Sequence, residues 1–346
     1  MTVAVLRALE KTGRIAVCPV SSRSSLQWPG GSGVGCKMPW SSQPAPGRLL
    51  ADHFHPWLVP SAAKRAVWYY PKGFLPVCGG GSRRIVVTIH DTILQHNQDY
   101  YPEWRSAWDY RYWLGLLAHT LRRADRILTV SGTAKEQIEA FMQRRGMPPK
   151  EILVTYEPCA YEGIAQPITP GKGDYVMHFA SVEPHKGTAR LVRCWHDAEK
   201  AGGDVPVLRL VGRVPPEVAE MVQAARTMAS VGFLSDEELQ ACYQGARALV
   251  FPSEIEGFGL PALEAYYLGT PVCFVKGTSV EEVLSVATRK GGFDLADPES
   301  LFAALDEVLA MTPEEVRECG LILRGTYASA KVAEKMVRVF EEVVQR

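Results

Sequence analysis

Two glutamates flank a turn whose backbone N–H groups could hold a phosphate. Glu256 and Glu264 are separated by seven residues that include Gly-Phe-Gly-Leu-Pro. The apolar run 246–251 predicts a buried strand before them, and Pro261 followed by Ala-Leu-Glu-Ala predicts a helix start. The helix N-terminus would aim free N–H groups at a bound anion. The backbone groups concerned are those of Phe258, Gly259 and Leu260. The plain alternative is an ordinary crossover in which both glutamates are surface charges.

A lysine and a histidine also follow predicted strands. Lys186 lies in Glu-Pro-His-Lys-Gly, just after a predicted strand, where its ammonium group could bind an anionic ligand. His90 lies in Thr-Ile-His-Asp at the end of another strand, and ligands of open α/β sheets bind beyond the carboxyl ends of the strands. By residue type alone, an exposed turn lysine and a structural histidine are the alternatives.

Two series of alternating strand and helix patterns would position these side chains. The first has strands at 84–89, 127–130 and 152–156, and helices at 102–123 and 133–145. The second has strands at 175–179, 207–211, 230–233, 248–251 and 271–275, with helices between them and a closing helix at 334–345. This alternation predicts parallel sheets with covering helices, and the Pro/Gly-rich run 167–174 predicts a linker between two domains.

The first eighty residues are less regular. They predict a helix at 3–9, a strand at 14–17 and an irregular segment at 21–47 that is rich in Ser, Gly and Pro. Sheets of this class normally open with a strand and a glycine-rich turn, so we expect the first domain to lack its first strand, or the true start to lie upstream of Met1. Further on, Trp104, Trp108 and Tyr112 recur every four residues, which favours a core-facing helix stripe over a lipid or acceptor surface.

Composition supports two cores and an uneven charge distribution. The chain has 346 residues, 47% of them apolar, and a formal net charge of zero. Residues 1–170 contain 20 Lys/Arg against 12 Asp/Glu, and the remainder contains 18 against 26. The basic half would suit an anionic membrane surface or acceptor, and two oppositely charged solvated domains are the alternative. Eight scattered cysteines, no signal peptide and no membrane-spanning apolar run predict a cytoplasmic protein with at most peripheral membrane contact.

Together these segments resemble the retaining glycosyltransferases of family four, which have the two-domain GT-B fold. The segment from Phe251, Phe-Pro-Ser-Glu-Ile-Glu-Gly-Phe-Gly-Leu-Pro, resembles the family's E-x7-E motif. The Lys186 turn resembles the family's Glu-Pro-Arg-Lys turn, with Ala180 in place of a glycine and His185 in place of the arginine. Three more segments resemble parts of the family pattern. Residues 90–91 resemble its His-Asp step, residues 125–131 its Ala-Asp-Arg-Ile-x-Thr-Val-Ser strand end, and residues 231–239 the segment before its E-x7-E turn. The resemblance covers roughly residues 84–345 and becomes weaker before residue 84.

The resemblance implies a fold and a set of site residues. We expect two Rossmann-like domains facing a cleft: an acceptor-side domain at 1–168 and a nucleotide-sugar-binding domain at 169–330, with a C-terminal helix at 331–346 packing back on the first. His90 and Glu256 would be catalytic, His90 at the transition state and Glu256 on the sugar hydroxyls, while Glu264 would bind the ribose. The other implied donor-binding residues are Ser181, Lys186, Gly232, Phe233, Leu234, Phe258, Gly259 and Leu260, and the secondary candidates are Asp91, Ser131 and Arg213.

The implied activity is retaining transfer of a hexose from a nucleotide-diphosphate sugar to a glycan or lipid-linked acceptor in bacterial surface polysaccharide or lipopolysaccharide synthesis. Mannose from GDP-mannose is favoured, because the His-Asp and Glu-Pro-x-Lys turns look like those of the mannosyltransferase-rich part of the family. No Asp-x-Asp motif occurs, so we expect no metal or other cofactor, and no nucleic-acid partner. Two rivals stay open: a non-hydrolysing sugar-nucleotide epimerase, and a catalytically impaired nucleotide-sugar-binding or scaffold protein.

Overall fold

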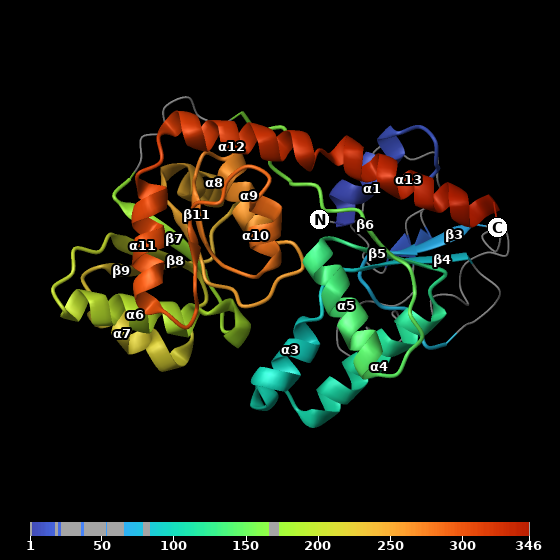
Figure 1. Ribbon diagram of the computed structural model, residues 1–346, viewed down its shortest axis with the longest axis horizontal. Coiled ribbons are helices and arrows are strands. Elements are labelled where there is room, and N and C mark those ends of the chain that lie inside the picture. Colours follow the sequence, from blue (N-terminus) through green and yellow to red (C-terminus); the bar gives the residue numbers. More distant parts are fainter. Residues whose placement is uncertain are drawn as a thin grey trace. The chain divides into compact units, whose positions relative to one another are not determined.

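The computed structural model describes residues 2–17, 20–21, 36–37, 53, 66–78, 84–165 and 173–345. The chain forms two compact units and passes between them more than once (Figure 1). The first unit comprises Met1–Gln95, Arg105–Pro158 and Ser329–Arg346, and the second comprises His96–Trp104 and Cys159–Ala328. The division therefore falls after Pro158 rather than after residue 168, and the segment 96–104 belongs to the second unit.

The first unit is a parallel sheet with helices on both faces (Figure 1). Its strands run in the order β3 (Val67–Tyr70), β4 (Arg84–Ile89), β5 (Arg126–Thr129) and β6 (Ile152–Val154). Its helices are α1 (Thr2–Lys11), α4 (Ala107–Arg123), α5 (Gly132–Arg144) and α13 (Ser329–Gln345). Val86 packs with α1 and α13, whereas Val87 and Ile89 pack with α4 and α5. Burial on both faces explains why β4 is a nearly continuous apolar run.

The beginning of the chain differs in part from expectation. The helix α1 is confirmed, but residues 14–17 are irregular rather than a strand. Arg14 instead pairs with Glu334 and Glu341 of α13, at 2.8 and 2.5 Å, which ties this turn to a helix and not to a sheet. A two-residue ladder pairs β1 (Val20–Ser21) with β2 (Cys36–Lys37). The rest of the predicted irregular segment 21–47 lies outside the described residues.

The predicted aromatic core stripe is wrong. Trp104 ends the short 3₁₀ helix η2 (Pro102–Trp104), which follows α3 (Ile93–Tyr100). Ser106 caps a new helix, α4, so Trp104 and Trp108 do not share one helical face. They are 39% and 81% exposed. Only Tyr112 is partly buried, with its hydroxyl oxygen 2.6 Å from His53 Nε2.

The second unit is a six-stranded parallel sheet in the order β12-β11-β10-β7-β8-β9. Its strands are β7 (Tyr175–Ala180), β8 (Val207–Gly212), β9 (Met228–Gly232), β10 (Leu249–Phe251), β11 (Val272–Val275) and β12 (Gly292–Phe293). Every predicted strand of the second series is confirmed within two residues, and β12 was not predicted. Residues 166–172, most of the predicted linker, lie outside the described part of the chain.

Helices cover this second sheet (Figure 1). They are η3 (Pro184–Lys186), α6 (Thr188–Lys200), η4 (Pro216–Val218), α7 (Ala219–Ala224), α8 (Asp236–Gly245), α9 (Leu260–Tyr267), α10 (Ser279–Leu284), α11 (Pro298–Leu309) and α12 (Pro313–Thr326). One core packs the sheet against α6, α7 and α11, with Trp195 fully buried in it. No described helix has the length and apolarity that a membrane span requires.

Candidate functional site

The candidate site lies where the strand order of the second unit changes direction. From β7 the chain proceeds to β8 and β9 on one side, and then returns to β10 and β11 on the other. The loops that leave the carboxyl ends of β7 and β10 therefore diverge to opposite sides of the sheet. Open α/β sheets bind their ligands at this switch point. The β7 loop carries Lys186 and the β10 loop carries Glu256.

Lys186 and Glu256 form an ion pair across these two loops. Lys186 Nζ lies 2.7 Å from Glu256 Oε1, and their side chains are 27% and 10% exposed. Gly187 permits this approach: its φ is 71°, and a Cβ there would lie 2.5 Å from the carbonyl oxygen of Pro252. An ammonium group has three donors, so Lys186 can keep this carboxylate and also bind a second anion.

The turn after Glu256 leads directly into helix α9. Gly259 caps the helix in the left-handed region, with φ 86°. Ser279 Oγ donates to the carbonyl oxygen of Glu256 at 2.9 Å and so fixes the turn from the other side. The ring of Phe258 is buried, which leaves only its backbone to reach a ligand. The first turn of α9 consequently offers a helix N-terminus beside the ion pair.

Glu264 lies one turn into α9 and is half-buried. Tyr243, fully buried on α8, donates its hydroxyl proton to Glu264 Oε2 at 3.1 Å. Burial raises the pKa of Glu264 to about 7, although the hydrogen bond from Tyr243 opposes the shift. Near neutral pH the carboxyl group is therefore partly protonated and partly ionised. The protonated form can donate a hydrogen bond, and the ionised form can only accept one.

Glu254 joins the segment 96–104 to the site. Its carboxylate accepts hydrogen bonds from His96 Nε2 at 3.0 Å, Tyr101 Oη at 2.6 Å and Arg190 Nη2 at 2.5 Å. Burial alone would raise its pKa, but these three donors lower it to about 2. Its backbone N–H donates to the carbonyl oxygen of His185 at 2.9 Å. Sequence reasoning missed this role, because His96 and Glu254 are 158 residues apart.

A buried histidine fixes the start of the Lys186 loop. His178 Nδ1 donates to the carbonyl oxygen of Val250 at 3.0 Å, and its Nε2 accepts from the Thr188 hydroxyl at 2.9 Å. Burial lowers the pKa of His178 to about 4, so the ring is neutral. Thr188 Oγ1 accepts from the Ser181 N–H at 3.0 Å, and Ser181 Oγ accepts from the Glu183 N–H at 3.1 Å. The Ser181 side chain thus first stabilises its own turn.

The β7 loop presents one lysine and no second cation. His185, which stands in place of the arginine expected from the resemblance, is 1% exposed, and burial followed by the charge of Lys186 lowers its pKa to about 3. It is therefore neutral and cannot contribute charge. Arg213 is the nearby exposed cation: its N–H donates to the carbonyl oxygen of Ala180 at 3.0 Å, which places it beside the start of the loop.

The remaining predicted donor residues follow β9, at the same edge of the parallel sheet. Gly232 ends the strand with φ 69°, and Phe233 after it is 84% exposed. Leu234 is half-buried and precedes the start of α8. The predicted capping box there is confirmed, with Ser235 and Glu238 bonding each other's backbone N–H groups.

His90 lies in the first unit, after β4, with both ring nitrogens engaged. Nδ1 lies 2.7 Å from Glu157 Oε1, and Nε2 lies 2.6 Å from the carbonyl oxygen of Pro71. Burial lowers the pKa of His90, but Glu157 raises it by hydrogen bond and charge, and the net shift is upward. Tyr156, the residue before Glu157, has φ 64° and is the one non-glycine residue in the described ranges with a positive φ. Sequence reasoning missed Glu157.

Two of the secondary candidates begin helices in the first unit. Asp91 Oδ1 accepts from the Ile93 N–H at 3.0 Å, at the start of α3. Ser131 is fully buried, and its Oγ accepts from the Ala134 N–H at 2.9 Å as the N-cap of α5. These contacts give both residues structural roles. Asp and Ser are preferred at positions just before a helix, so their residue types were the sequence signal for this capping role.

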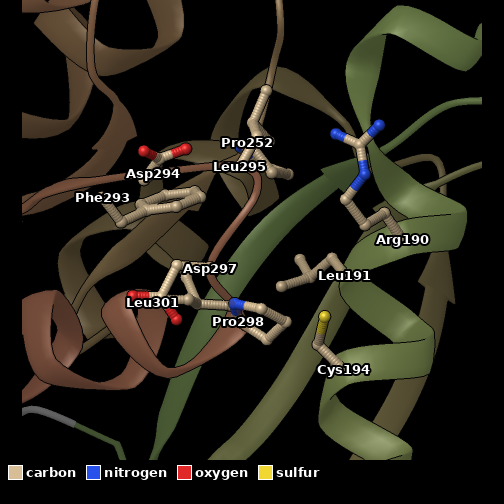
Figure 2. Close-up of a pocket in the computed structure, with 10 residues that line it drawn as sticks. All are labelled: Arg190, Leu191, Cys194, Pro252, Phe293, Asp294, Leu295, Asp297, Pro298 and Leu301. Atoms are coloured by element: carbon tan, nitrogen blue, oxygen red, sulfur yellow. The ribbon is translucent and has the colours of Figure 1, made fainter.

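A small pocket in the second unit is a packing gap. Figure 2 shows Arg190, Leu191 and Cys194 of α6 on one side of it, with Phe293 and Pro298 on the other. Its volume of about 20 Å³ would hold about one water molecule, which excludes a sugar or nucleotide. Within the described ranges, no three His, Cys, Asp or Glu side chains are grouped to hold a metal ion.

Comparison with known proteins relates this site to a family. Residues 162–320 match the family model described as glycosyl transferases group 1. The chain is 27% identical over 280 residues to O-antigen chain mannosyltransferase B of Escherichia coli, covering 76% of this chain and 69% of that protein. It is 28% identical over 246 residues to O-antigen chain mannosyltransferase RfbU of Salmonella typhimurium, covering 65% of this chain and 66% of that protein. About a third of each relative lies outside the match.

One solved structure has a fold similar to that of this chain. Sucrose-phosphate synthase from Thermosynechococcus elongatus superposes with a TM-score of 0.70 at 17% identity, over 98% of this chain and 91% of that chain. The predicted GT-B class, with two parallel α/β sheets, is confirmed. The segment that matches the glycosyl transferases group 1 model lies within the second unit, and it includes Lys186, Glu256 and Glu264.

Proposed function

We propose that the protein is a retaining glycosyltransferase that moves a hexose from a nucleotide-diphosphate sugar to a hydroxyl group of a glycan or glycolipid. The observation that carries this proposal is the Lys186–Glu256 pair at the strand switch point, 2.7 Å between Nζ and Oε1. A cation and a helix N-terminus suit a diphosphate, while buried carboxylates suit sugar hydroxyls. The site offers both within one pair of loops.

In this proposal the residues divide the donor between them. Lys186 and the N-terminus of α9 bind the diphosphate and stabilise the negative charge that grows on it as it leaves. Arg213 adds a second cation from the end of β8. Glu256 accepts hydrogen bonds from the sugar hydroxyls, and Glu264 exchanges its bond with Tyr243 for a ribose hydroxyl.

The configuration at the anomeric carbon is retained if the acceptor attacks the face from which the diphosphate leaves. The bond from the anomeric carbon to the diphosphate oxygen breaks, the bond to the acceptor oxygen forms, and the acceptor proton moves to the diphosphate. Because Lys186 and α9 take the leaving charge, we propose that neither a metal ion nor another cofactor is required. We also propose that His90 is catalytic, as the resemblance implies.

Mannose from GDP-mannose is the donor that we favour. Its support is the printed function of the relatives, two O-antigen chain mannosyltransferases. The same names support a role in bacterial surface polysaccharide synthesis. We place the protein in the cytoplasm, and the excess of Lys and Arg in residues 1–170 supports peripheral contact with anionic lipid on the inner face of the membrane.

The test is turnover with a panel of nucleotide sugars. The purified protein is incubated with GDP-mannose, UDP-glucose and ADP-glucose in the presence of EDTA, and NMR follows the anomeric proton of the product. We expect turnover of GDP-mannose with retained configuration, and a loss of about 100-fold or more in Glu256→Gln. The control, Glu315→Gln, removes a carboxylate from a surface pair with Lys290. An inverted product, or turnover only after metal is added, contradicts the proposal.

A second candidate is a nucleotide-sugar-binding protein that does not transfer the sugar. The observation that favours it is His90, whose two ring nitrogens already bind Glu157 and Pro71 of its own unit. The turnover experiment separates the two functions. Calorimetric binding of a nucleotide sugar, without hydrolysis or transfer from any donor of the panel, would select the binding protein.

A further inference from the structure

We infer that an open aromatic pocket beside the Lys186 loop binds a neutral hexopyranose ring of the acceptor glycan. The inference rests on the proposed function and adds an acceptor subsite to it. The aromatic pocket has a volume of about 490 Å³, within the range of ligand sites. It is lined by Tyr100, Tyr101, Pro102, Glu103, Trp104 and Pro184.

The lining has the chemistry of a sugar subsite. Tyr100 is 69% exposed and Trp104 is 39% exposed, so large apolar ring surface faces solvent. One face of a pyranose ring carries mostly C–H groups, and it can cover such rings while its hydroxyls stay hydrated. Glu103, also exposed, supplies a carboxylate that accepts hydrogen bonds from those hydroxyls. Three aromatic rings and one carboxylate match a ring that is apolar on its face and polar at its edge.

The charge of the lining selects a neutral ligand. None of the six lining residues is Lys or Arg, and one is an acid. A phosphate, a nucleotide or an anionic lipid headgroup would meet the Glu103 carboxylate there, with no Lys or Arg among the lining residues to balance it. The donor's diphosphate therefore belongs with Lys186, and the aromatic pocket is left for the uncharged partner of the reaction.

The pocket adjoins the candidate donor site by two links. Pro184 forms its wall and begins the 3₁₀ turn that ends at Lys186, and two residues of such a turn span about 4 Å. Tyr101 lines the pocket and donates to Glu254, which lies two residues before Glu256. A sugar ring held there would thus lie next to the loops that hold the donor. This is where an acceptor chain must lie for its hydroxyl to reach the anomeric carbon.

The experiment compares Trp104→Ala with Trp108→Ala. Trp108 is also exposed, at 81%, but does not line the pocket, which makes it a matched control. Saturation-transfer NMR measures binding of methyl glycosides of mannose, glucose, galactose and N-acetylglucosamine, with mannose 6-phosphate as the anionic probe. We expect at least one neutral glycoside to bind the wild type and the control. Trp104→Ala should bind it roughly tenfold more weakly, the scale of one lost aromatic stacking contact.

A second variant tests the charge argument, and nucleotide titration separates the two proposals. Glu103→Gln should reduce the ratio of the affinity for the bound neutral glycoside to the affinity for mannose 6-phosphate, with nucleotide affinity unchanged within twofold. Equal glycoside binding by the two tryptophan variants, or no glycoside binding to a wild type that binds a nucleotide, would overturn the subsite. Loss of nucleotide affinity in Trp104→Ala would assign the pocket to the donor instead. A wild type that binds no nucleotide would count against the proposed function.

Discussion

Glu264 is a half-buried residue, and the protonation of its carboxyl group is coupled to folding. Its pKa is about 7 in the folded protein, against 4.5 for an exposed glutamate. Between pH 4.5 and 7 the folded state keeps a proton that the unfolded state releases, so this residue lowers the free energy of unfolding as the pH rises through that window. The loss is complete above pH 7. The same proton would make ribose binding at Glu264 sensitive to pH near neutrality.

Glu264→Gln should remove this decline. Because glutamine does not ionise, we expect the free energy of unfolding of the variant, relative to that of the wild type, to rise by about 2–3 kcal/mol between pH 4.5 and pH 8. Urea denaturation at several pH values measures the difference, with the exposed Glu217→Gln as control. A stability difference between Glu264→Gln and wild type that does not change with pH would show that Glu264 titrates normally.

At the scale of elements, the start of α9 depends on one glycine. Gly259 has φ 86°, and a Cβ there would lie 2.6 Å from a methyl group of Val280. We expect Gly259→Ala to cost about 2–4 kcal/mol of stability, from backbone strain and the clash, and to abolish nucleotide binding. Adding Val280→Ala should recover part of the stability by relieving the clash alone. Thermal unfolding and calorimetry measure the two effects. A Gly259→Ala protein with full stability would contradict this geometry.

The Glu254 network holds the segment 96–104 on the second unit. Glu254→Ala leaves His96, Tyr101 and Arg190 without their acceptor. We expect a stability loss of about 2–3 kcal/mol, less than for a fully buried pair because Arg190 is partly exposed. Hydrogen exchange of the peptide 96–104 should accelerate about tenfold or more. Glu183→Ala in the neighbouring loop is the control, and unchanged exchange in Glu254→Ala would show that other contacts hold the segment.

At the scale of the whole molecule, the chain's last helix stabilises its first unit. Met336 of α13 is 2% exposed and packs with Leu9 and Val86. Met336→Ala should cost about 2–5 kcal/mol by leaving a cavity in this core. Nucleotide affinity should stay within twofold, because the candidate donor residues lie in the second unit. Urea denaturation and calorimetry on the same samples test this, and a large loss of affinity would couple the helix to the donor site.

Local signals predicted much of the fold and the two loops of the candidate site. The strands of the second series are short apolar runs, and the turns at Gly187 and Gly259 carry the residues that such geometry requires. The misses have long-range causes. The Trp104 stripe ignored the helix start at Ser106, and the Arg14 turn is fixed by α13, more than 300 residues away. The partners of Glu254 and His90 are likewise distant in sequence, so no local pattern reveals them.

The most direct measurement is calorimetric titration with GDP, UDP and ADP of the wild type, Lys186→Ala and Lys290→Ala. Both variants remove a lysine from a Lys–Glu pair, but only Lys186 lies at the strand switch point. We predict that one nucleotide binds the wild type and Lys290→Ala equally, and binds Lys186→Ala about 10- to 100-fold more weakly because a charge-assisted hydrogen bond is lost. Equal affinity in both variants, or no binding to the wild type, would contradict a donor site at Lys186 and Glu256.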